Sequence, residues 1–198
     1  MHWLVVLSVL AVGCGSSTNA PAPKPAPVQK PAGWTVPAGW KSELIPFPLE
    51  FAPLIQHTGA EELRFPPGFF DEKSGEYFSY AFIWRTTDAA EIDAKQLGGE
   101  LSIYFQGLTA EVDRAKKRIE KRDGIAVTAT ANGARFDLVA KTYDPFTTSL
   151  PVDLVGWAER VGCKSGAIWI FVLAPAKTTI RKQLDELATA AKATCDRG

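Results

Sequence analysis

The stretch of sequence that decides the fold is AIWIFVLA, residues 167–174, a run in which every side chain is apolar. A run of this length, rich in β-branched and aromatic residues, is typical of a strand that is buried on both faces. Pro175 follows the run and ends it. We therefore place residues 167–174 in the middle of a sheet. Residues 151–161 predict a further strand, joined to the central one by a glycine-containing turn.

Residues 124–143 predict a β-hairpin in which the turn and the strands agree with one another. Asn132-Gly133 is a preferred pair for a two-residue type I′ turn. Pairing outward from this turn places Val127 opposite Leu138, and the apolar residues of both strands then fall on one face. The hairpin therefore supplies two more strands of the sheet.

Three strands are predicted in the first part of the domain, where apolar and polar residues alternate and turn residues separate the runs. Pro46 and Pro48 lie two residues apart, so the two positions without a backbone N–H face the same side of the first strand. That side cannot form a full set of hydrogen bonds with a neighbouring strand. We therefore expect this strand at an edge of the sheet. The three strands cover residues 40–51, 61–65 and 77–85.

The first of two predicted helices follows these strands. Asp88 and Glu91 have the form of a capping box, which predicts a helix that starts directly after Asp88. Apolar residues at helical spacing continue as far as residue 119. Glycine weakens a helix, so one helix and two helices both stay open between residues 89 and 122. The glycines of this segment are Gly98, Gly99 and Gly107.

The second predicted helix follows the central strand, with Thr178 or Thr179 as its N-cap. Its apolar residues form one stripe, which we expect to pack on the sheet. The order of elements is three strands, a helical region, four strands and a helix. This order predicts an α+β fold, a mostly antiparallel sheet of about seven strands with its helices on one face. The stripe consists of Ile180, Leu184, Leu187, Ala188 and Ala191.

The N-terminus carries a short apolar run, LVVLSVLAVGC, at residues 4–14. The run is too short to span a bilayer and has the length of the apolar region of a secretory signal. Residues 10–14, LAVGC, resemble the lipobox of bacterial lipoproteins, although Ala11 stands where that family usually has Leu. The resemblance implies that residues 1–13 are a signal peptide and that Cys14 is lipidated. A secretory signal without lipid and an unprocessed N-terminus are the alternatives.

This resemblance also implies where the protein is located. A diacylglyceryl group on Cys14 supplies two acyl chains, enough for stable anchoring, so the first expected partner is a membrane. Residues 14–39 then comprise the lipidated cysteine and an extended Pro/Ala-rich tether, and residues 40–198 form a single α+β domain. By resemblance to enterobacterial sorting, Gly15 implies the outer membrane, facing the periplasm. Residues 40–84 are similar to segments of uncharacterised secreted bacterial proteins, which implies no activity.

The two remaining cysteines, Cys163 and Cys195, form an even pair once Cys14 is lipidated. Disulfides persist in the oxidising compartment that a signal peptide implies. Cys163 ends a predicted strand and Cys195 ends the last helix. We therefore predict a disulfide that joins this helix to the sheet, with two buried free thiols as the alternative.

Composition and motifs argue against several classes of function. The chain has 22 acidic and 22 basic residues, and this balance argues against nucleic acid as the main partner. Two histidines, His2 and His57, and three cysteines are too few for a metal site. The sequence contains no phosphate loop, dinucleotide fingerprint or nucleophile elbow. We therefore predict no cofactor, no metal and no catalytic residue.

Three functions stay open, in the following order. The first is a non-enzymatic envelope lipoprotein that binds an envelope protein or stabilises an assembly. The second is a carrier of a lipid or small apolar ligand, held between the sheet and the helices. The third is an envelope hydrolase that uses Glu62 and His57. The residues expected to contact the ligand of a carrier are Tyr80, Phe82, Trp84, Tyr104 and Phe105.

Overall fold

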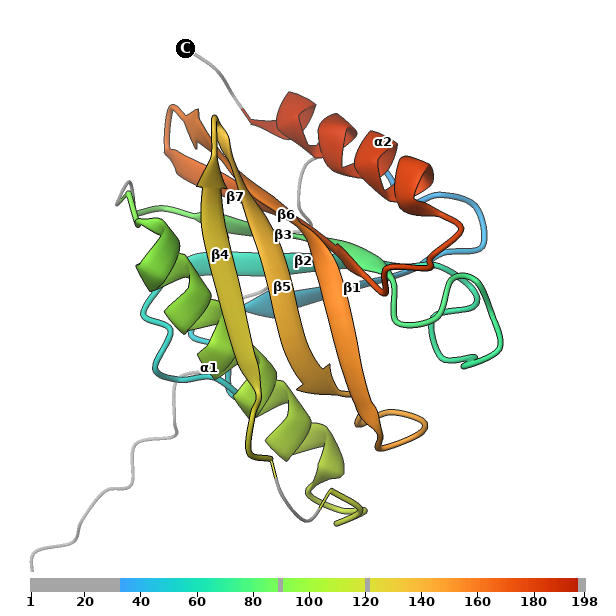
Figure 1. Ribbon diagram of the computed structural model, residues 1–198. Coiled ribbons are helices and arrows are strands. Elements are labelled where there is room, and N and C mark those ends of the chain that lie inside the picture. The colour runs from blue at the N-terminus through green and yellow to red at the C-terminus, as the bar shows by residue number, and fades with distance from the viewer. Residues whose placement is uncertain (1–32, 89–90, 120–121, 196–198) are drawn as a thin grey trace, which may run out of the picture.

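The structure, a computed structural model, describes residues 33–88, 91–119 and 122–195. Within these residues, seven antiparallel strands form one sheet in the order β1-β2-β3-β7-β6-β5-β4 (Figure 1). The predicted α+β class is confirmed. The elements are β1 Lys41–Pro46, β2 Gly59–Phe65, β3 Tyr80–Thr86, α1 Ala94–Asp113, β4 Ala126–Asn132, β5 Arg135–Tyr143, β6 Pro151–Cys163, β7 Gly166–Ala174, α2 Arg181–Ala191 and a 3₁₀ turn at Lys192–Thr194.

The predicted signal peptide, Cys14 and residues 15–32 of the predicted tether lie outside the described residues. Within the described ranges, no helix is both long enough and apolar enough to cross a bilayer.

β7 lies at the centre of the sheet, between β3 and β6, as predicted. Its residues from Ala167 to Ala174 are all buried, and they alternate between two hydrophobic cores on opposite faces. α1 covers one face of the sheet and α2 covers the other (Figure 1), which corrects the prediction that both helices pack on one face. Central strands that are apolar on both faces require a covering layer on each side, and a helix supplies each one.

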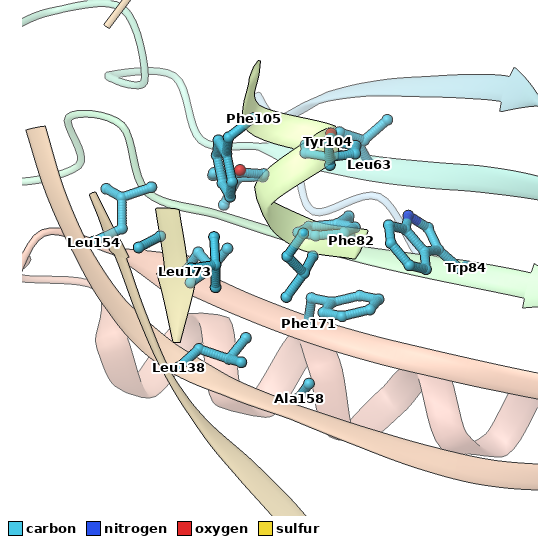
Figure 2. Packing of buried hydrophobic residues seen from close by; sticks show 14 of the residues in the cluster. Leu63, Phe82, Trp84, Tyr104, Phe105, Leu138, Leu154, Ala158, Phe171 and Leu173 are labelled. Carbon is cyan, nitrogen blue, oxygen red and sulfur yellow. The ribbon is translucent and has the colours of Figure 1, made fainter. Parts of the chain in front are cut away.

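The first core lies on the α1 side of the sheet, and every strand contributes a side chain to it. The Tyr104 ring of α1 stacks on Phe82 of β3 with 5.6 Å between ring centroids, and Phe82 stacks on Phe171 of β7 at 4.4 Å (Figure 2). In Figure 1, β4 and β5 cross the direction of β1 and β2 steeply. This strong twist brings both ends of the sheet to the same helix.

The second core lies under α2 and includes a residue that we assigned to the tether. The predicted apolar stripe of α2 is buried, as expected. Trp34 is also buried here, and its indole N–H donates to the Leu187 carbonyl at 3.0 Å. The Arg64 guanidinium lies 4.2 Å from the centroid of the Trp34 ring. The folded domain therefore begins before Trp40 and takes in Trp34.

α1 is one continuous helix, but it starts later than predicted. Asp93 is its N-cap, and its side chain accepts a 2.8 Å hydrogen bond from the Gln96 N–H. The Gln96 side chain accepts from the Asp93 N–H in return, which completes a capping box. The predicted box of Asp88 and Glu91 is wrong because the Asp88 carboxylate contacts His57 instead.

α1 also covers the outer edge of β4. The Val127 N–H donates to the Ser102 hydroxyl at 2.8 Å, and the Gln106 side-chain amide donates to the Ile125 carbonyl at 3.2 Å. A Cβ atom on Gly98 would lie 2.8 Å from the Val127 carbonyl oxygen, so the helix can approach this closely only with glycine there. The helix therefore satisfies backbone groups that an open edge would expose.

The hairpin of β4 and β5 has the predicted faces but a different register. Val127 pairs with Ala140 and Asn132 with Arg135, so the two-residue loop consists of Gly133 and Ala134. Gly133 has a φ of +60°, and Ala134 is not among the residues with positive φ. A two-residue loop with glycine first fits a type II′ turn rather than type I′. The shift is two residues, so the apolar side chains keep their common face.

Several other segment boundaries differ from the predictions, among them that of the third strand, which was predicted at residues 77–85 and is Tyr80–Thr86. β1 is an edge strand, as expected, but it ends at Pro46. After it the chain turns, with hydrogen bonds from the Ala52 N–H to the Leu49 carbonyl and from the Ile55 N–H to the Ala52 carbonyl. Leu49 and Ile55 are fully buried in this loop. The apolar residues after Pro46, which the prediction assigned to the first strand, therefore belong to a buried loop.

The N-cap of α2 is Ile180, not Thr178 or Thr179, and no side chain caps it. The Thr178 hydroxyl instead donates to the Gly75 carbonyl at 3.1 Å, in the loop before β3. The same hydroxyl accepts from the Ile180 N–H at 3.5 Å, so Thr178 holds the residue before the helix to the loop before β3 and is not itself the N-cap.

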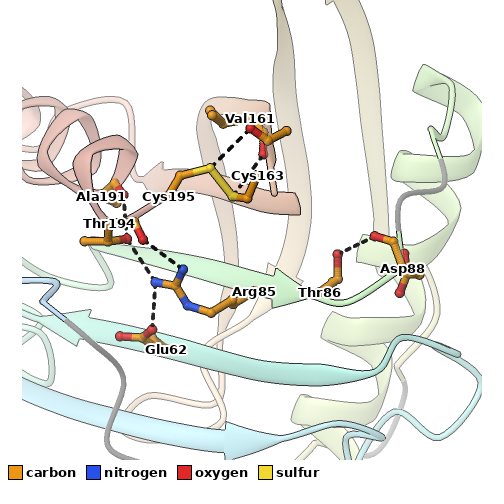
Figure 3. The surroundings of a disulfide bond; sticks show 10 residues. Glu62, Arg85, Thr86, Asp88, Val161, Cys163, Ala191, Thr194 and Cys195 are labelled. Atoms are coloured by element: carbon orange, nitrogen blue, oxygen red, sulfur yellow. Dashed lines mark hydrogen bonds and ion pairs between the residues drawn. A yellow bond between two sulfur atoms is a disulfide. The ribbon is translucent and has the colours of Figure 1, made fainter. Parts of the chain in front are cut away.

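The predicted disulfide is present and joins the end of α2 to the sheet. Cys163 at the end of β6 is bonded to Cys195, with 5.3 Å between their Cα atoms (Figure 3). Close by, the Arg85 guanidinium of β3 donates to the Thr194 hydroxyl at 2.9 Å and lies 3.5 Å from a Glu62 carboxylate oxygen. The C-terminal end of the domain is therefore tied to two strands.

Candidate functional site

A cavity of about 250 Å³ lies between β1–β3 and the C-terminal half of α1. Its walls are almost wholly apolar, and aromatic rings form much of them. They come from the first three strands, from α1 and from the loops that follow β1, precede β3 and follow β5. The lining residues are Glu43, Ile45, Phe51, Leu63, Phe65, Phe69, Phe78, Tyr80, Tyr104, Leu108, Val112 and Phe146.

The aromatic wall results from the alternation of side chains along the strands and from one residue in a strained backbone conformation. Leu63 and Phe65 alternate with polar residues on β2, so both face α1, and Tyr80 of β3 lies beside them. The Phe65 and Tyr80 rings stack with 6.1 Å between centroids. Phe78 has a φ of +45°, a conformation rare for a bulky residue, and its ring is 2 % exposed. The fold thus holds Phe78 in the wall at a conformational cost.

Two buried polar groups lie at this wall. The Tyr80 side chain lines the cavity, and among the described residues its hydroxyl has no hydrogen-bond partner. Burial raises the pKa of Tyr80 well above its usual value, and the charge of Glu61 adds to the increase. The Tyr80 hydroxyl therefore keeps its proton.

Glu61 is fully buried on the same face, opposite the lining residue Ile45. One carboxyl oxygen accepts from the Trp84 indole N–H at 3.2 Å, and the other has no partner among the described residues. Desolvation raises the pKa of Glu61 to about 8, although hydrogen bonds with Trp84 and Tyr104 lower it. Glu61 is therefore uncharged at neutral pH.

His57 holds the loop after β1 to the start of α1. Its Nδ1 lies 3.2 Å from an Asp88 oxygen and its Nε2 lies 3.0 Å from a Glu100 oxygen. Its ring packs edge-on against Phe47 and lies 5.6 Å from Trp84. The hydrogen bond with Glu100 is the largest cause of a raised pKa; desolvation opposes it, and both carboxylate charges support it.

A groove of about 550 Å³ runs along the segment from Leu44 to Phe51 on the outer side of β1 and reaches Glu111 of α1. The Phe47 N–H donates inward to the Gly59 carbonyl, so the backbone groups of Leu44 and Pro46 point outward. Ile45 and Phe51 line both this groove and the cavity. Their side chains therefore separate the cavity from the surface at this edge.

The structure brings together only part of the predicted carrier site. Tyr80 and Tyr104 line the cavity, whereas Phe82, Trp84 and Phe105 are buried in the core around it and are not lining residues. Sequence reasoning missed the loop aromatics of the wall. Phe69 and Phe146 directly follow turn residues, whereas Phe78 falls inside the strand predicted at residues 77–85. Nothing local shows that these three aromatic residues meet at one cavity.

The residues of the predicted hydrolase do not converge. Glu62 lies on the α2 face of β2, where it pairs with Arg64 at 3.2 Å and with Arg85 at 3.5 Å. His57 lies on the α1 face, against Trp84. Glu50 lies apart from both, in the outer groove. This arrangement offers no shared acid–base site.

No group of three or more potential ligands that could hold a metal ion occurs in the part of the chain that the structure describes. Cys14, the predicted lipidation site, lies outside the described residues. Comparison with known proteins identifies no matching family model, no significantly similar curated protein and no significantly similar solved structure. Function therefore has to be inferred from the cavity, the groove and the buried polar groups.

Proposed function

We propose that the domain binds a small apolar ligand in the cavity between β1–β3 and α1, in a protein held at the bacterial envelope through lipid on Cys14. The cavity itself carries this proposal, with about 250 Å³ and a mostly aromatic and aliphatic lining. Protein interiors are otherwise close-packed, and ligand pockets are mostly apolar with few polar groups. An occupant accounts for a space of this size inside an aromatic core.

The volume limits the ligand. An apolar cavity of about 150 Å³ accepts benzene, so by the same ratio this one accepts on the order of ten non-hydrogen atoms. A whole diacyl lipid is too large. A small aromatic or aliphatic molecule, or the end of one longer chain, fits. Ile45 and Phe51 line both the cavity and the groove, which supports an entry at the outer edge of β1 through movement of these side chains.

Titration with cumene, a small apolar aromatic molecule, tests the proposal. The full chain carrying Cys14→Ala cannot be lipidated, so no acyl chain of its own competes with the added ligand. We expect cumene to bind and to raise the melting temperature in proportion to its concentration. Val112→Trp places a larger side chain at the cavity wall and should abolish binding. Val139→Trp, on an exposed position of β5, is the matched control and should bind as before.

Two outcomes count against this function. If small apolar molecules neither release heat nor shift the melting temperature, the cavity does not take ligands. If Val112→Trp binds as tightly as the control, binding occurs elsewhere. Solvent extraction of protein purified from its own envelope, followed by mass spectrometry, should also yield one dominant small apolar compound.

A protein partner is the second candidate, favoured by the groove along the outer edge of β1. A photo-crosslinking residue in place of Leu44 should capture one defined envelope protein in intact cells. The same residue in place of Val139, exposed on β5, should capture none. Equal crosslinking from both positions would remove this candidate.

Membrane anchoring is tested separately by the intact mass of the mature protein. We expect cleavage before Cys14 together with acylation, and the loss of both in Cys14→Ala. An unlipidated product of the unchanged chain would contradict the anchor and leave the ligand-binding proposal standing.

A further inference from the structure

We propose that the ligand of this cavity is a small organic cation, whose apolar part fills the cavity and whose ammonium group lies beside Glu43 at the rim. The inference rests on the proposed function and names the class of ligand that the cavity selects. It starts from Glu43, the one charged side chain among the described residues of the lining.

Glu43 lies where the lining of the cavity reaches the surface. It belongs to β1, the edge strand, and it pairs with the lining residue Leu63 of β2. The alternation of side chains along β1 places Glu43 on the same face as Ile45, toward α1. Glu43 is exposed and also lines the cavity, so this residue can contact water and an occupant at once.

The charge of Glu43 acts on the inner wall of the cavity. Burial is the main cause that raises the pKa of Glu61 and of Tyr104, and the negative charge of Glu43 adds to both increases. Glu61 and Tyr104 therefore keep their protons at neutral pH, and Glu43 supplies the charge that an occupant meets. In surroundings of low polarity this charge is felt more strongly than it would be in water.

No basic side chain offsets this charge in the part of the chain that the structure describes. No lysine or arginine lines the cavity. Among the described residues, Glu43 also forms no ion pair. Lys41, two residues earlier on the same face of β1, lies over the Phe70 ring instead, 5.6 Å from its centroid. An anionic ligand would therefore meet a like charge without a counter-charge, whereas a cation would complete an ion pair.

The aromatic lining favours the same sign of charge. The face of an aromatic ring attracts a cation, and cages of aromatic rings bind quaternary ammonium ligands. Phe51 and Tyr104 both line the cavity, with 5.2 Å between their ring centroids. An ammonium group at the rim also keeps part of its water shell, so it is less costly to bind there than in the interior.

Phenyltrimethylammonium and tert-butylbenzene test this inference as a matched pair. The two molecules have the same skeleton and shape, and they differ in a positively charged nitrogen against a neutral carbon. Affinities for the Cys14→Ala chain are measured by calorimetry with and without Glu43→Gln, which removes the charge and keeps the size of the side chain. Because tert-butylbenzene leaves water more readily, the informative quantity is the change in the affinity ratio of the two ligands between the two chains.

We expect Glu43→Gln to shift this ratio by about two- to fivefold toward tert-butylbenzene, the effect of one ion pair at an exposed site. Glu186→Gln is the matched control, since it removes the same charge from an exposed position of α2, on the other side of the sheet, and it should leave the ratio unchanged. Val112→Trp, at the cavity wall, should abolish the binding of both molecules.

The outcomes separate this inference from the proposed function. If tert-butylbenzene binds and phenyltrimethylammonium does not, or if Glu43→Gln leaves their ratio unchanged, the inference is wrong, while the cavity still binds apolar ligands. Phenyltrimethylammonium that still binds to the Val112→Trp chain would lie outside the cavity and would equally overturn the inference. If neither molecule binds, the proposed function fails and the inference falls with it.

Discussion

His57 touches a carboxylate with each ring nitrogen, Asp88 at 3.2 Å and Glu100 at 3.0 Å. A neutral imidazole can donate from one nitrogen only, so both contacts are favourable only when the ring is protonated. The raised pKa of His57 has the same origin. Protonated His57 therefore holds the loop after β1, which supplies the cavity wall residue Phe51, to α1.

We predict that His57 stabilises the domain at acidic pH. Because its folded pKa is raised, its contribution is fully present below about pH 6.5, the unfolded pKa, and is lost as pH rises through the folded pKa. His57→Gln should cost about 1.5–3 kcal/mol near pH 5.5 and less at higher pH. Urea unfolding across this range checks it. A cost that does not change with pH would contradict the prediction.

Glu61 titrates in an overlapping window with the same sign. Its pKa is about 8 in the folded domain against an ordinary value of 4.5, so the folded state holds the proton more tightly. We expect stability to fall between about pH 4.5 and 8, by about 5 kcal/mol in all. Glu61→Gln mimics the protonated form and should remove this fall. Wild-type and variant curves that stay parallel from pH 5 to 9 would show that Glu61 is ionised throughout.

At the scale of elements, the glycines of α1 have different roles in one helix. A Cβ atom would lie 1.9 Å from the Phe51 carbonyl oxygen at Gly107 and 2.8 Å from the Val127 carbonyl oxygen at Gly98. At Gly99 it would meet nothing within 4 Å. Two of the glycines thus permit close packing of the helix against backbone, while Gly99 only weakens the helix.

Alanine substitutions should separate these roles. We predict that Gly99→Ala raises the free energy of unfolding by about 1 kcal/mol through helix propensity. Gly107→Ala should lower it by about 1–3 kcal/mol through overpacking, with Gly98→Ala between the two. Gly107→Ala should also weaken cumene binding, because Phe51 lines the cavity. Equal effects at Gly99 and Gly107 would mean that the close approach to Phe51 is absent.

At the scale of the whole molecule, the domain is two cores that share one sheet. The α2 core is closed at one side by Trp34, which binds the Leu187 carbonyl and stacks on Arg64. The same arginine donates to the Trp34 carbonyl at 2.8 Å. This short N-terminal segment is therefore a structural part of the layer that α2 forms.

We predict that a truncated chain beginning at Trp40 is less stable than one beginning at Gly33. The loss should be about 3–5 kcal/mol, the cost of removing a buried tryptophan, and Trp34→Ala in the longer chain should reproduce most of it. Equilibrium unfolding in urea of the three proteins measures the difference. Coincident unfolding curves for both chain lengths would show that Trp34 contributes no stability.

The aromatic wall shows how far the sequence led toward the candidate site. Tyr80 and Tyr104 were predicted as ligand contacts because each lies on the apolar face of a strongly patterned element, and both line the cavity. Phe82 and Trp84 share that face but are covered by neighbouring side chains. Phe146 stayed unpredicted because it lies in a loop, where no periodicity marks the direction of a side chain.

The sequence by itself determined the order and kind of the elements, the edge position of β1, the central position of β7 and the disulfide of Cys163 and Cys195. These features follow from local patterns. Side-chain periodicity and proline positions act within a single strand, and an even pair of cysteines in an oxidising compartment forms a disulfide. Only the tertiary structure decided the side on which each helix packs, the hairpin register, the helix caps, the partners of His57 and the burial of Trp34. Each of these is set by contacts between residues distant in the chain, where a partner across the fold competes with the local choice and wins because it buries more surface or satisfies a buried polar group.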